Sequence, residues 1–369
     1  MTNKLNISFV TQNLAPFRLN WLRELSKYYY ITVYHNNEYD KTFNMNSLKN
    51  INVGDIKIYM IKNKIFNKIP VYNFFKIFSN KYDILILDGY GFWSQILLIM
   101  ILKIFKKNYI VSLDGGLIRE EKKLKKLCKS FIIKGATYYL STSSTTDLYL
   151  IHYGIKYEKI LRHKLSSVYN NDILKNPVCL EKKQKLRIKY KITKKNVIIG
   201  IGRFIPIKGF DILIKAMKNI KETELILVGG VLTEEYNAII KANKLSDVVT
   251  FINHVSKEEV IELLDLSDVF VLPTRGDVWG LVINEAMARG LPIITTNKCV
   301  AGVSLIENNK NGFIVEVDNL HELQEKINYL LLNDDIRLQM SKNNLKKIKN
   351  YSLEHIAIED KINLSKYFY

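Results

Sequence analysis

Short apolar runs alternate with longer amphipathic stretches along most of this 369-residue chain. The apolar runs have the length and continuity of buried parallel strands, and the stretches between them repeat with the period of helices packed on a sheet. In the first half, strands are predicted at 5–11, 30–34, 83–87, 109–113 and 136–141. In the second half they are predicted at 197–201, 224–228, 249–251, 269–272 and 292–295.

This alternation predicts an α/β chain with two doubly wound parallel sheets. The polar, Lys-rich segment 170–195 contains Pro177 and separates the two series, so it is predicted to be a linker followed by a helix. The expected domains are therefore 1–172 and 173–352. In open sheets of this kind ligands bind beyond the carboxyl ends of the strands, which makes the loops there the first candidates for a site.

One stretch, residues 269–296, carries the most specific pattern in the sequence. It predicts a strand, a loop with Gly276 and Gly280, a helix, and a second strand. Backbone N–H groups at such a helix start favour an anion. Asp277 in the loop and Glu285 in the helix add two carboxylates, a combination that suits a ligand with both phosphate and hydroxyl groups. The spacing alone also fits an ordinary βαβ unit with solvated acids.

The same stretch resembles the signature of family 4 retaining glycosyltransferases, which have the GT-B fold. Asp277 is a departure, because the family usually has Glu in that position. The resemblance implies two Rossmann-like domains that face a cleft, with residues 353–369 crossing back onto the first domain. The matching positions are Pro273, Thr274, Asp277, Trp279, Gly280, Leu281, Glu285, Ala286, Met287, Ala288, Gly290 and Pro292.

A second segment, Gly202-Arg203 through Lys208-Gly209, resembles the Gly-Arg…Lys-Gly segment of the same family. Fixed cations there would stabilise the charge on a departing nucleoside diphosphate without a metal ion. Taken alone, Arg203 and Lys208 also fit two exposed cations on a loop of a basic protein.

The resemblance implies further roles for single residues. Glu285 is expected to accept hydrogen bonds from ribose, and Asp277 from hydroxyls of the donor sugar. Backbone groups of Gly280, Leu281 and Val282 are candidates for phosphate binding. The pair Gly229 and Gly230 is expected to let a nucleoside lie close to the backbone, although it also fits a simple turn.

The first domain matches the family less well. Its first loop, residues 12–18, lacks the glycines of many relatives, and Asp114 takes the position where many carry a His near the reacting sugar. Asp114 is expected in a catalytic position and Arg18 on the acceptor side, with both facing the cleft, where either could contact the acceptor or the donor. Both also fit ordinary loop residues.

The net charge of the chain limits the classes of ligand and partner that are expected. The formal net charge of +19 favours anionic ligands or an acidic membrane surface. No usual nucleic-acid-binding motif occurs, and Cys128, Cys179 and Cys299 have no metal-ligand spacing. The chain has neither a signal peptide nor an apolar run of the roughly 20 residues that a spanning helix needs, so a cytoplasmic protein is expected.

Residues 119–134 predict a basic amphipathic helix with net charge of seven minus two, or +5. Its apolar positions are Leu124, Leu127, Cys128, Phe131 and Ile132. Either this stripe packs on the sheet beneath a solvated face, or the helix binds acidic lipid headgroups at the inner face of a membrane.

Together these features predict a metal-independent, retaining glycosyltransferase that uses a UDP- or GDP-sugar as substrate and needs no further cofactor. Its expected acceptor is a glycolipid or polysaccharide of the cell surface. The rival hypotheses are a nucleotide-sugar epimerase with the same fold and a non-enzymatic, basic nucleic-acid-binding protein.

Overall fold

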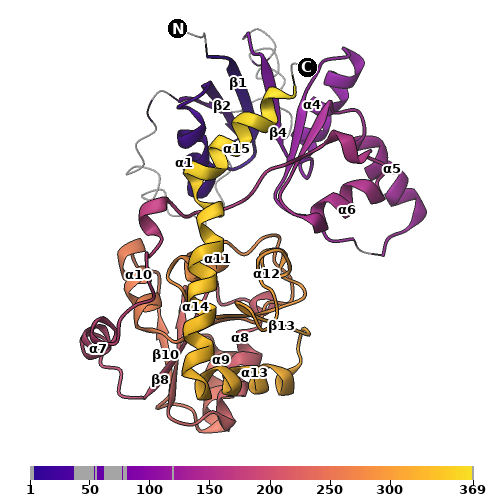
Figure 1. Cartoon of the computed structure of the whole chain (residues 1–369). Helices are drawn as coiled ribbons and strands as arrows, with labels where there is room; N and C mark the ends of the chain where they lie inside the picture. Colours follow the sequence, from indigo (N-terminus) through magenta and orange to yellow (C-terminus); the bar gives the residue numbers. More distant parts are fainter. Residues whose placement is uncertain are drawn as a thin grey trace. The chain divides into compact units, whose positions relative to one another are not determined.

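The computed structural model describes residues 4–36, 54, 56–61, 77, 81–118 and 120–367. The chain divides into two compact units (Figure 1). Unit 1 comprises Met1–Ser167 together with Leu353–Tyr369, and unit 2 comprises Val168–Ser352. Each unit is built on its own parallel sheet, which confirms the predicted fold class.

Unit 1 has a seven-stranded sheet in the order β3-β2-β1-β4-β5-β6-β7, in which every pairing is parallel. Five of these strands match the predicted ones, whereas β3 and β7 were not predicted. The strand order reverses between β1 and β4, and a reversal of this kind places the ligand site of many open sheets. The strands are β1 (Asn6–Thr11), β2 (Tyr30–Asn36), β3 (Lys57–Ile61), β4 (Ile84–Asp88), β5 (Ile110–Leu113), β6 (Tyr138–Ser141) and β7 (Ile160–Arg162).

The helices of unit 1 cover this sheet. The first begins at Pro16, because proline fits the first helical position, where its missing N–H costs no hydrogen bond. The basic helix is shorter than the predicted 119–134, and Arg119 lies outside the described residues. The helices are α1 (Pro16–Leu25), α4 (Trp93–Ile104), α5 (Lys123–Ile133), α6 (Ser144–His152) and α15 (Leu353–Ser365).

The last helix, α15, is part of the core of unit 1, where it lies along α1 (Figure 1). Asp360 of α15 is 1% exposed and accepts a hydrogen bond of 2.7 Å from the indole of Trp21. The ring of His163 lies 3.0 Å from the same carboxylate. Buried polar groups need such partners, so these contacts fix the end of the chain to the first helix.

Unit 2 has a six-stranded parallel sheet in the order β10-β9-β8-β11-β12-β13. Every residue of β8, β9, β11 and β12 is buried, as expected for strands covered on both faces. Only β13 lacks a predicted counterpart. The strands are β8 (Asn196–Ile201), β9 (Thr223–Val228), β10 (Val249–Ile252), β11 (Val269–Leu272), β12 (Ile293–Thr296) and β13 (Gly312–Val315).

The helices of unit 2 follow the predicted alternation. Segment 170–195 contains one helix, α7, and the long pair α13 and α14 closes the unit. None of the described helices of either unit is long and apolar enough to cross a membrane. The helices are α7 (Leu180–Lys189), α8 (Phe210–Ala216), α9 (Glu234–Asn243), α10 (Lys257–Leu266), α11 (Leu281–Ala288), α12 (Val300–Leu305), α13 (Leu320–Leu332) and α14 (Asp334–Ile348).

Candidate active site

Two of the predicted site residues meet at the carboxyl edge of the unit 2 sheet. Lys208 lies in the loop after β8, and Asp277 lies in the loop after β11. These two strands are neighbours in the sheet, which brings their loops together. The Lys208 Nζ atom lies 2.5 Å from Asp277 Oδ2, and both side chains are partly exposed, at 16% and 17%.

Arg275, which the sequence did not single out, ties these two loops together. Its guanidinium donates to both carboxylate oxygens of Asp211 at 2.8 Å, and its Nε donates to Asp318 at 2.7 Å. Its backbone N–H donates to the carbonyl of Ile207 at 2.7 Å. We call this set of contacts the Arg275 clamp. The clamp fixes the turn that carries Lys208 against the loop that carries Asp277.

The Arg275 clamp also changes the pKa of Asp211. Burial alone would raise the pKa of this carboxyl group, but the hydrogen bonds and charge of Arg275 outweigh burial and hold the pKa below its ordinary value. Bidentate pairs of arginine with carboxylate are short and directional, so they suit this positioning role. Both partners are therefore ionised at neutral pH.

Glycines permit close backbone approaches in this site. A Cβ atom on Gly229 would lie 2.7 Å from the carbonyl oxygen of Gly202, so the loops after β8 and β9 touch through their backbones. A Cβ on Gly230 would meet the ring of Phe204 at 2.9 Å. The glycines at 229 and 230 are therefore required by contacts within the protein, because the backbone of Gly202 and the ring of Phe204 occupy the space of their missing side chains.

The start of α11 is shaped by Gly280, which has a φ of 102°. A side chain there would be strained, and its Cβ would lie 2.8 Å from the Cys299 Sγ atom. Cys299 is fully buried, and burial raises the pKa of its thiol to about 12, so it remains a thiol. Helix α11 therefore begins sharply at Leu281, and the N–H groups of its first turn lack intrahelical partners.

The remaining predicted residues of unit 2 lie around this helix start. Leu281, Val282 and Glu285 are half-buried members of α11. Arg203 is exposed, and its side chain forms no hydrogen bond or ion pair with the residues that the structure describes. The structure thus joins Lys208 and Asp277 directly and leaves Arg203 at the edge of the group.

The two predicted residues of unit 1 also meet, at the carboxyl edge of their own sheet. Arg18 Nη2 bonds to Asp114 and, at 2.8 Å, to Asp88 Oδ1. Arg18 is only 2% exposed, so its guanidinium contacts these carboxylates rather than solvent. Asp88 was not predicted as a site residue, although it ends β4 just as Asp114 follows β5.

Two carboxylates share one guanidinium in this cluster, so one positive charge faces two negative charges. The raised pKa of Asp88 reflects burial together with this excess of negative charge. Burial, together with a smaller contribution from the charge of Asp114, holds the pKa of Asp88 at about 6, above its ordinary value of 3.8. The charge of Arg18, a hydrogen bond from Thr11 and the charge of His163 lower it, but they do not offset burial. Arg18 gains from both carboxylates, so its own pKa is raised despite burial, with a further contribution from Asp360.

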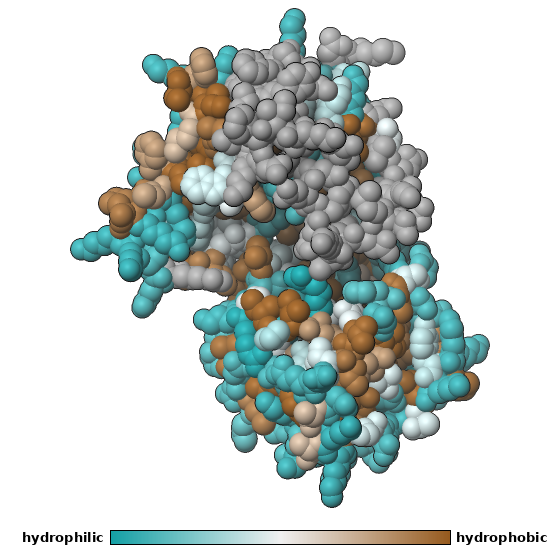
Figure 2. Space-filling model, turned by 180° about the vertical axis from the view of Figure 1, so that it is seen from behind, coloured by the Kyte–Doolittle hydropathy of each residue, from teal (hydrophilic) through white to brown (hydrophobic). Residues whose placement is uncertain are grey.

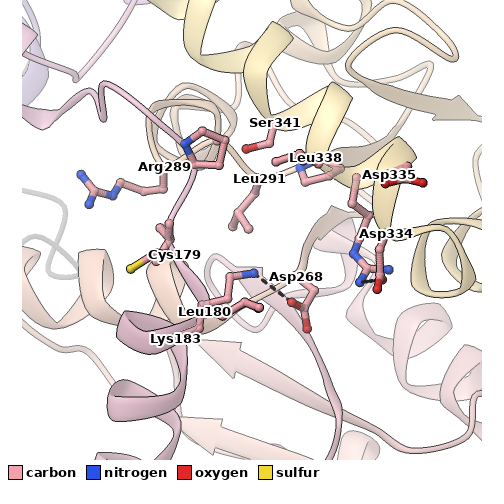
Figure 3. A pocket seen from close by; sticks show the side chains of 15 residues that line it. Cys179, Leu180, Lys183, Asp268, Arg289, Leu291, Asp334, Asp335, Leu338 and Ser341 are labelled. Carbon is pink, nitrogen blue, oxygen red and sulfur yellow. Dashed lines mark hydrogen bonds and ion pairs between the residues drawn. The ribbon is translucent and has the colours of Figure 1, made fainter.

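The described part of unit 2 also contains a cavity of ≈ 470 Å³, at the opposite edge of the sheet (Figure 3). Asp268 immediately precedes β11 and Pro292 precedes β12, so the cavity lies at the amino ends of these strands. Most of its charged groups are already paired: Lys183 lies 2.9 Å from Asp268, Arg289 lies 2.6 Å from Asp265, and Arg337 is paired with Asp334. The predicted site residues do not line this cavity.

The raised pKa of Asp88 predicts a pH-dependent stability. A carboxyl group with a raised pKa binds its proton more tightly in the folded chain than in the unfolded chain. Its contribution to the free energy of unfolding is therefore complete below pH 3.8 and is lost as the pH rises through about 6. We expect Asp88→Asn to gain stability relative to the native chain across this window, by up to about 3 kcal/mol.

Urea unfolding of the native and Asp88→Asn chains between about pH 4 and pH 7 measures this difference. Asp268→Asn is the control, because Lys183 and Arg187 hold the pKa of Asp268 below its ordinary value despite burial. The contribution of Asp268 is complete above pH 3.8, so its difference from the native chain stays constant over the same range. A constant difference for Asp88→Asn as well would contradict the prediction.

Comparison with known proteins adds to this geometry. Residues 182–347 match the family model described as Glycosyl transferases group 1. An uncharacterised glycosyltransferase of Haemophilus influenzae is 33% identical over 208 residues, which cover 55% of this chain and 57% of that protein. The capsular polysaccharide biosynthesis glycosyltransferase CapM of Staphylococcus aureus is 30% identical over 253 residues, which cover 62% and 65%. The chain therefore spans less than two thirds of either relative.

The fold has solved counterparts. The Anabaena protein HepE, in a crystal structure with UDP and glucose, superposes with a TM-score of 0.78 over 98% of this chain and 100% of its own, at 18% identity. The two parallel-sheet units thus have the GT-B arrangement of secondary structure. Unit 2, which carries the signature loops at the carboxyl edge of its sheet, therefore matches the glycosyl transferases group 1 family over residues 182–347.

Proposed function

We propose that this protein is a retaining glycosyltransferase that moves a sugar from a UDP- or GDP-sugar to a surface polysaccharide or glycolipid. The observation that carries the proposal is the group at the carboxyl edge of unit 2. There Lys208 and Asp277 meet beside the glycine-started helix α11. One cation, one carboxylate and a helix start match the phosphates and hydroxyls of a nucleotide sugar.

Each residue of this group has a proposed role. Lys208 and Arg203 bind the diphosphate and stabilise the charge that builds up as the glycosidic bond breaks. The backbone at Gly280, Leu281 and Val282 binds phosphate, and the loops with Gly202, Gly229 and Gly230 hold the nucleoside close to their backbone. Glu285 accepts from ribose, and Asp277 accepts from the donor sugar. In unit 1, which we assign to the acceptor side, Asp114 acts near the reacting sugar.

Asp277 neutralises Lys208 in this group, and the pair has a functional consequence. A diphosphate that binds Lys208 would compete with Asp277 for the ammonium group. The carboxylate would then be free to accept from a sugar hydroxyl, so that binding of phosphate and of sugar are linked. Asp is one methylene shorter than the Glu of relatives, and Gly276 beside it permits the loop to adjust.

The acceptor class rests on two supports. CapM, by its name, takes part in capsular polysaccharide biosynthesis. The second support is a surface of unit 1 that combines apolar and basic side chains, as a protein acting on a membrane-bound acceptor requires.

Loss of the diphosphate anchors should reduce turnover more than stability. We expect Lys208→Ala and Arg203→Ala each to lower kcat by about 10²–10³-fold, because a fixed charge aimed at developing charge is typically worth about 2.7–4 kcal/mol. Release of nucleoside diphosphate from a nucleotide sugar, measured in EDTA, gives the rate. Thermal unfolding gives the stability, and added UDP or GDP should raise the melting temperature of the native chain.

Lys215→Ala is the matched control for this test. Lys215 also pairs with an aspartate in unit 2, Asp211, but at 3.9 Å and on the exposed side of α8. Its removal should leave turnover within about twofold of native, as for a weak surface pair. Full turnover in Lys208→Ala and Arg203→Ala, or a strict need for added divalent metal, would contradict the assignment.

We further propose that unit 1 binds the inner, anionic face of a membrane through α5 and the end of α4. Three apolar side chains of α5 are exposed: Leu124 at 73%, Leu127 at 66% and Phe131 at 64%. They therefore do not pack on the sheet, contrary to one of the two readings of the sequence. Only Ile133 of this helix is buried.

The end of α4 extends this apolar surface. Lys103 of α4 donates to the carbonyls of Phe131 and Ile132, so the two helix ends lie side by side. Ile104 and Phe105, next to Lys103, are 74% and 65% exposed. We call these five exposed apolar residues of α4 and α5 the α4–α5 patch. Figure 2 shows apolar and polar side chains mixed on the face of unit 1 that carries these helices.

Basic side chains surround the α4–α5 patch and determine the lipid that fits it. Exposed lysines flank the apolar residues at the end of α4 and along α5. A surface of this kind inserts apolar side chains at the headgroup boundary while lysines contact anionic headgroups. The flanking lysines are Lys106, Lys107, Lys122, Lys123 and Lys125.

Charge reversal on α5 tests this contact. The test variant changes four lysines together to Glu: Lys122, Lys123, Lys125 and Lys126. We expect this variant to bind anionic vesicles at least about a hundredfold more weakly, since each basic residue near such a surface contributes about 1 kcal/mol. Co-sedimentation with vesicles of phosphatidylglycerol and phosphatidylcholine measures it. Neutral phosphatidylcholine vesicles should bind neither form strongly.

The control changes four exposed lysines of unit 2 to Glu: Lys218, Lys221, Lys342 and Lys346. This variant has the same net charge as the α5 variant, so any difference between them comes from position. Equal loss of binding in both variants would mean that only overall charge attracts the vesicles. Unchanged binding in the α5 variant would remove the proposed surface.

A further inference from the structure

The carboxyl edge of the unit 1 sheet holds a charged cluster built from three elements. Asp88 ends β4, Asp114 follows β5, and Arg18 lies in the first turn of α1. Strands β1, β4 and β5 are neighbours, and the strand order reverses between β1 and β4. The topology therefore brings these side chains to the point where open α/β sheets bind their ligands.

The backbones of the two acids are held in place by side chains. Gln95 donates to the carbonyl of Asp88 at 2.5 Å, and Thr142 donates to the carbonyl of Asp114 at 2.9 Å. Thr11 also donates to Asp88 Oδ2 at 2.7 Å. Both carboxylates are thus oriented before any ligand arrives.

Arg18 is enclosed beneath these acids. Its guanidinium carbon lies 5.6 Å from the ring centre of Phe9, 5.3 Å from that of Phe17 and 5.7 Å from that of Trp21. Nη2 serves both carboxylates, whereas Nη1 is buried without a hydrogen-bond partner among the described residues. A buried guanidinium with an unused donor group lowers the free energy of unfolding. Folded proteins rarely keep such a group unless it has a role beyond packing.

Arg18 therefore acts as a positioning residue, and the acids above it are the groups that can meet a ligand. Asp114 is 29% exposed, and its Oδ2 atom makes no hydrogen bond with any residue that the structure describes. With both acids ionised, two negative charges and one positive charge leave the cluster with a net charge of −1. Such a group accepts hydrogen bonds from hydroxyls and repels carboxylate or phosphate.

We propose that the Asp88–Arg18–Asp114 cluster binds a hydroxyl of an uncharged sugar through Asp114 and rejects sugars that carry an anionic group at that position. The inference rests on the proposed glycosyltransferase function and adds the charge class of the sugar. The hydroxyl belongs either to the donor sugar or to the acceptor sugar, and two arms of one experiment separate these sources.

The experiment compares the native chain with Asp114→Asn at about pH 8, where Asp88 is ionised. The first arm measures acceptor-free hydrolysis of UDP-glucose and UDP-glucuronate, or of GDP-mannose and GDP-mannuronate if the chain prefers GDP. The second arm adds methyl glucoside or methyl glucuronide to the preferred neutral donor and measures the additional release of nucleoside diphosphate. Asp114 is partly exposed, so this substitution leaves the Arg18–Asp88 pair and the fold in place.

In the native chain we expect nucleoside diphosphate to be released at least tenfold faster with the neutral sugar than with its anionic counterpart in one arm. Asp114→Asn should lower the rate with the neutral sugar and reduce that preference about tenfold in the same arm. The affected arm identifies the source: the first indicates the donor sugar, and the second indicates the acceptor sugar. Arg18→Lys keeps the charge but loses the two-carboxylate contact, so it should change the preference in the same direction with a smaller loss of stability than Arg18→Met.

Glu24→Gln is the control, because Glu24 is also an ion-paired acid of α1 but lies in the last turn, away from the carboxyl edge. It should leave both arms unchanged. Native-like rates and charge preference for Asp114→Asn in both arms would overturn the inference. Failure of the native chain to bind any nucleoside diphosphate in a separate titration would instead contradict the proposed function.

Discussion

The candidate donor site depends on the contacts of one arginine. Arg275 joins the turn before α8, the first turn of α8 through Asp211, and the loop after β13 through Asp318. Lys208 and Asp277 come from segments that are distant in sequence. Their side chains meet only if the loop after β8 and the loop after β11 are held in fixed positions relative to each other. The Arg275 clamp fixes these positions through its bidentate hydrogen bonds to Asp211, which cost little side-chain entropy because the guanidinium is planar and preorganised.

The two units place opposite kinds of chemistry at the carboxyl edges of similar sheets. In unit 2, a helix start and a lysine provide donors and positive charge, which suits phosphate. In unit 1, the edge carries two carboxylates on a buried arginine, which suits hydroxyls and disfavours anions. The proposed transferase needs both, because its donor would carry charge on the nucleotide and its sugars would present mostly hydroxyls. The opposite charges of the two edges are therefore consistent with one reaction.

Much of this could be predicted from the sequence, and the omissions have physical causes. The apolar runs of β8 and β11 were predicted because a buried strand needs a continuous apolar segment. Strand β7 has only two apolar residues before Arg162, and β13 has only three after Gly312, so neither run is long enough to be recognised. Lys208 and Asp277 were found through their motif, whereas Arg275 and Asp88 act through contacts with residues far along the chain, for which local sequence has no marker. The burial of Arg18 likewise depends on Phe9, Trp21 and two acids that only the fold assembles.

The central claim is that the Arg275 clamp holds the turn with Lys208 in the geometry that binds a diphosphate. Isothermal titration of UDP and GDP into the full chain and into Arg275→Lys tests it most directly, with Arg337→Lys as a control because Arg337 pairs with Asp334 on the distant α14. The account predicts that Arg275→Lys weakens binding of the preferred nucleotide at least about tenfold, as expected when a binding group is displaced, while Arg337→Lys binds as the native chain does. Equal affinity of the native and Arg275→Lys chains would contradict it.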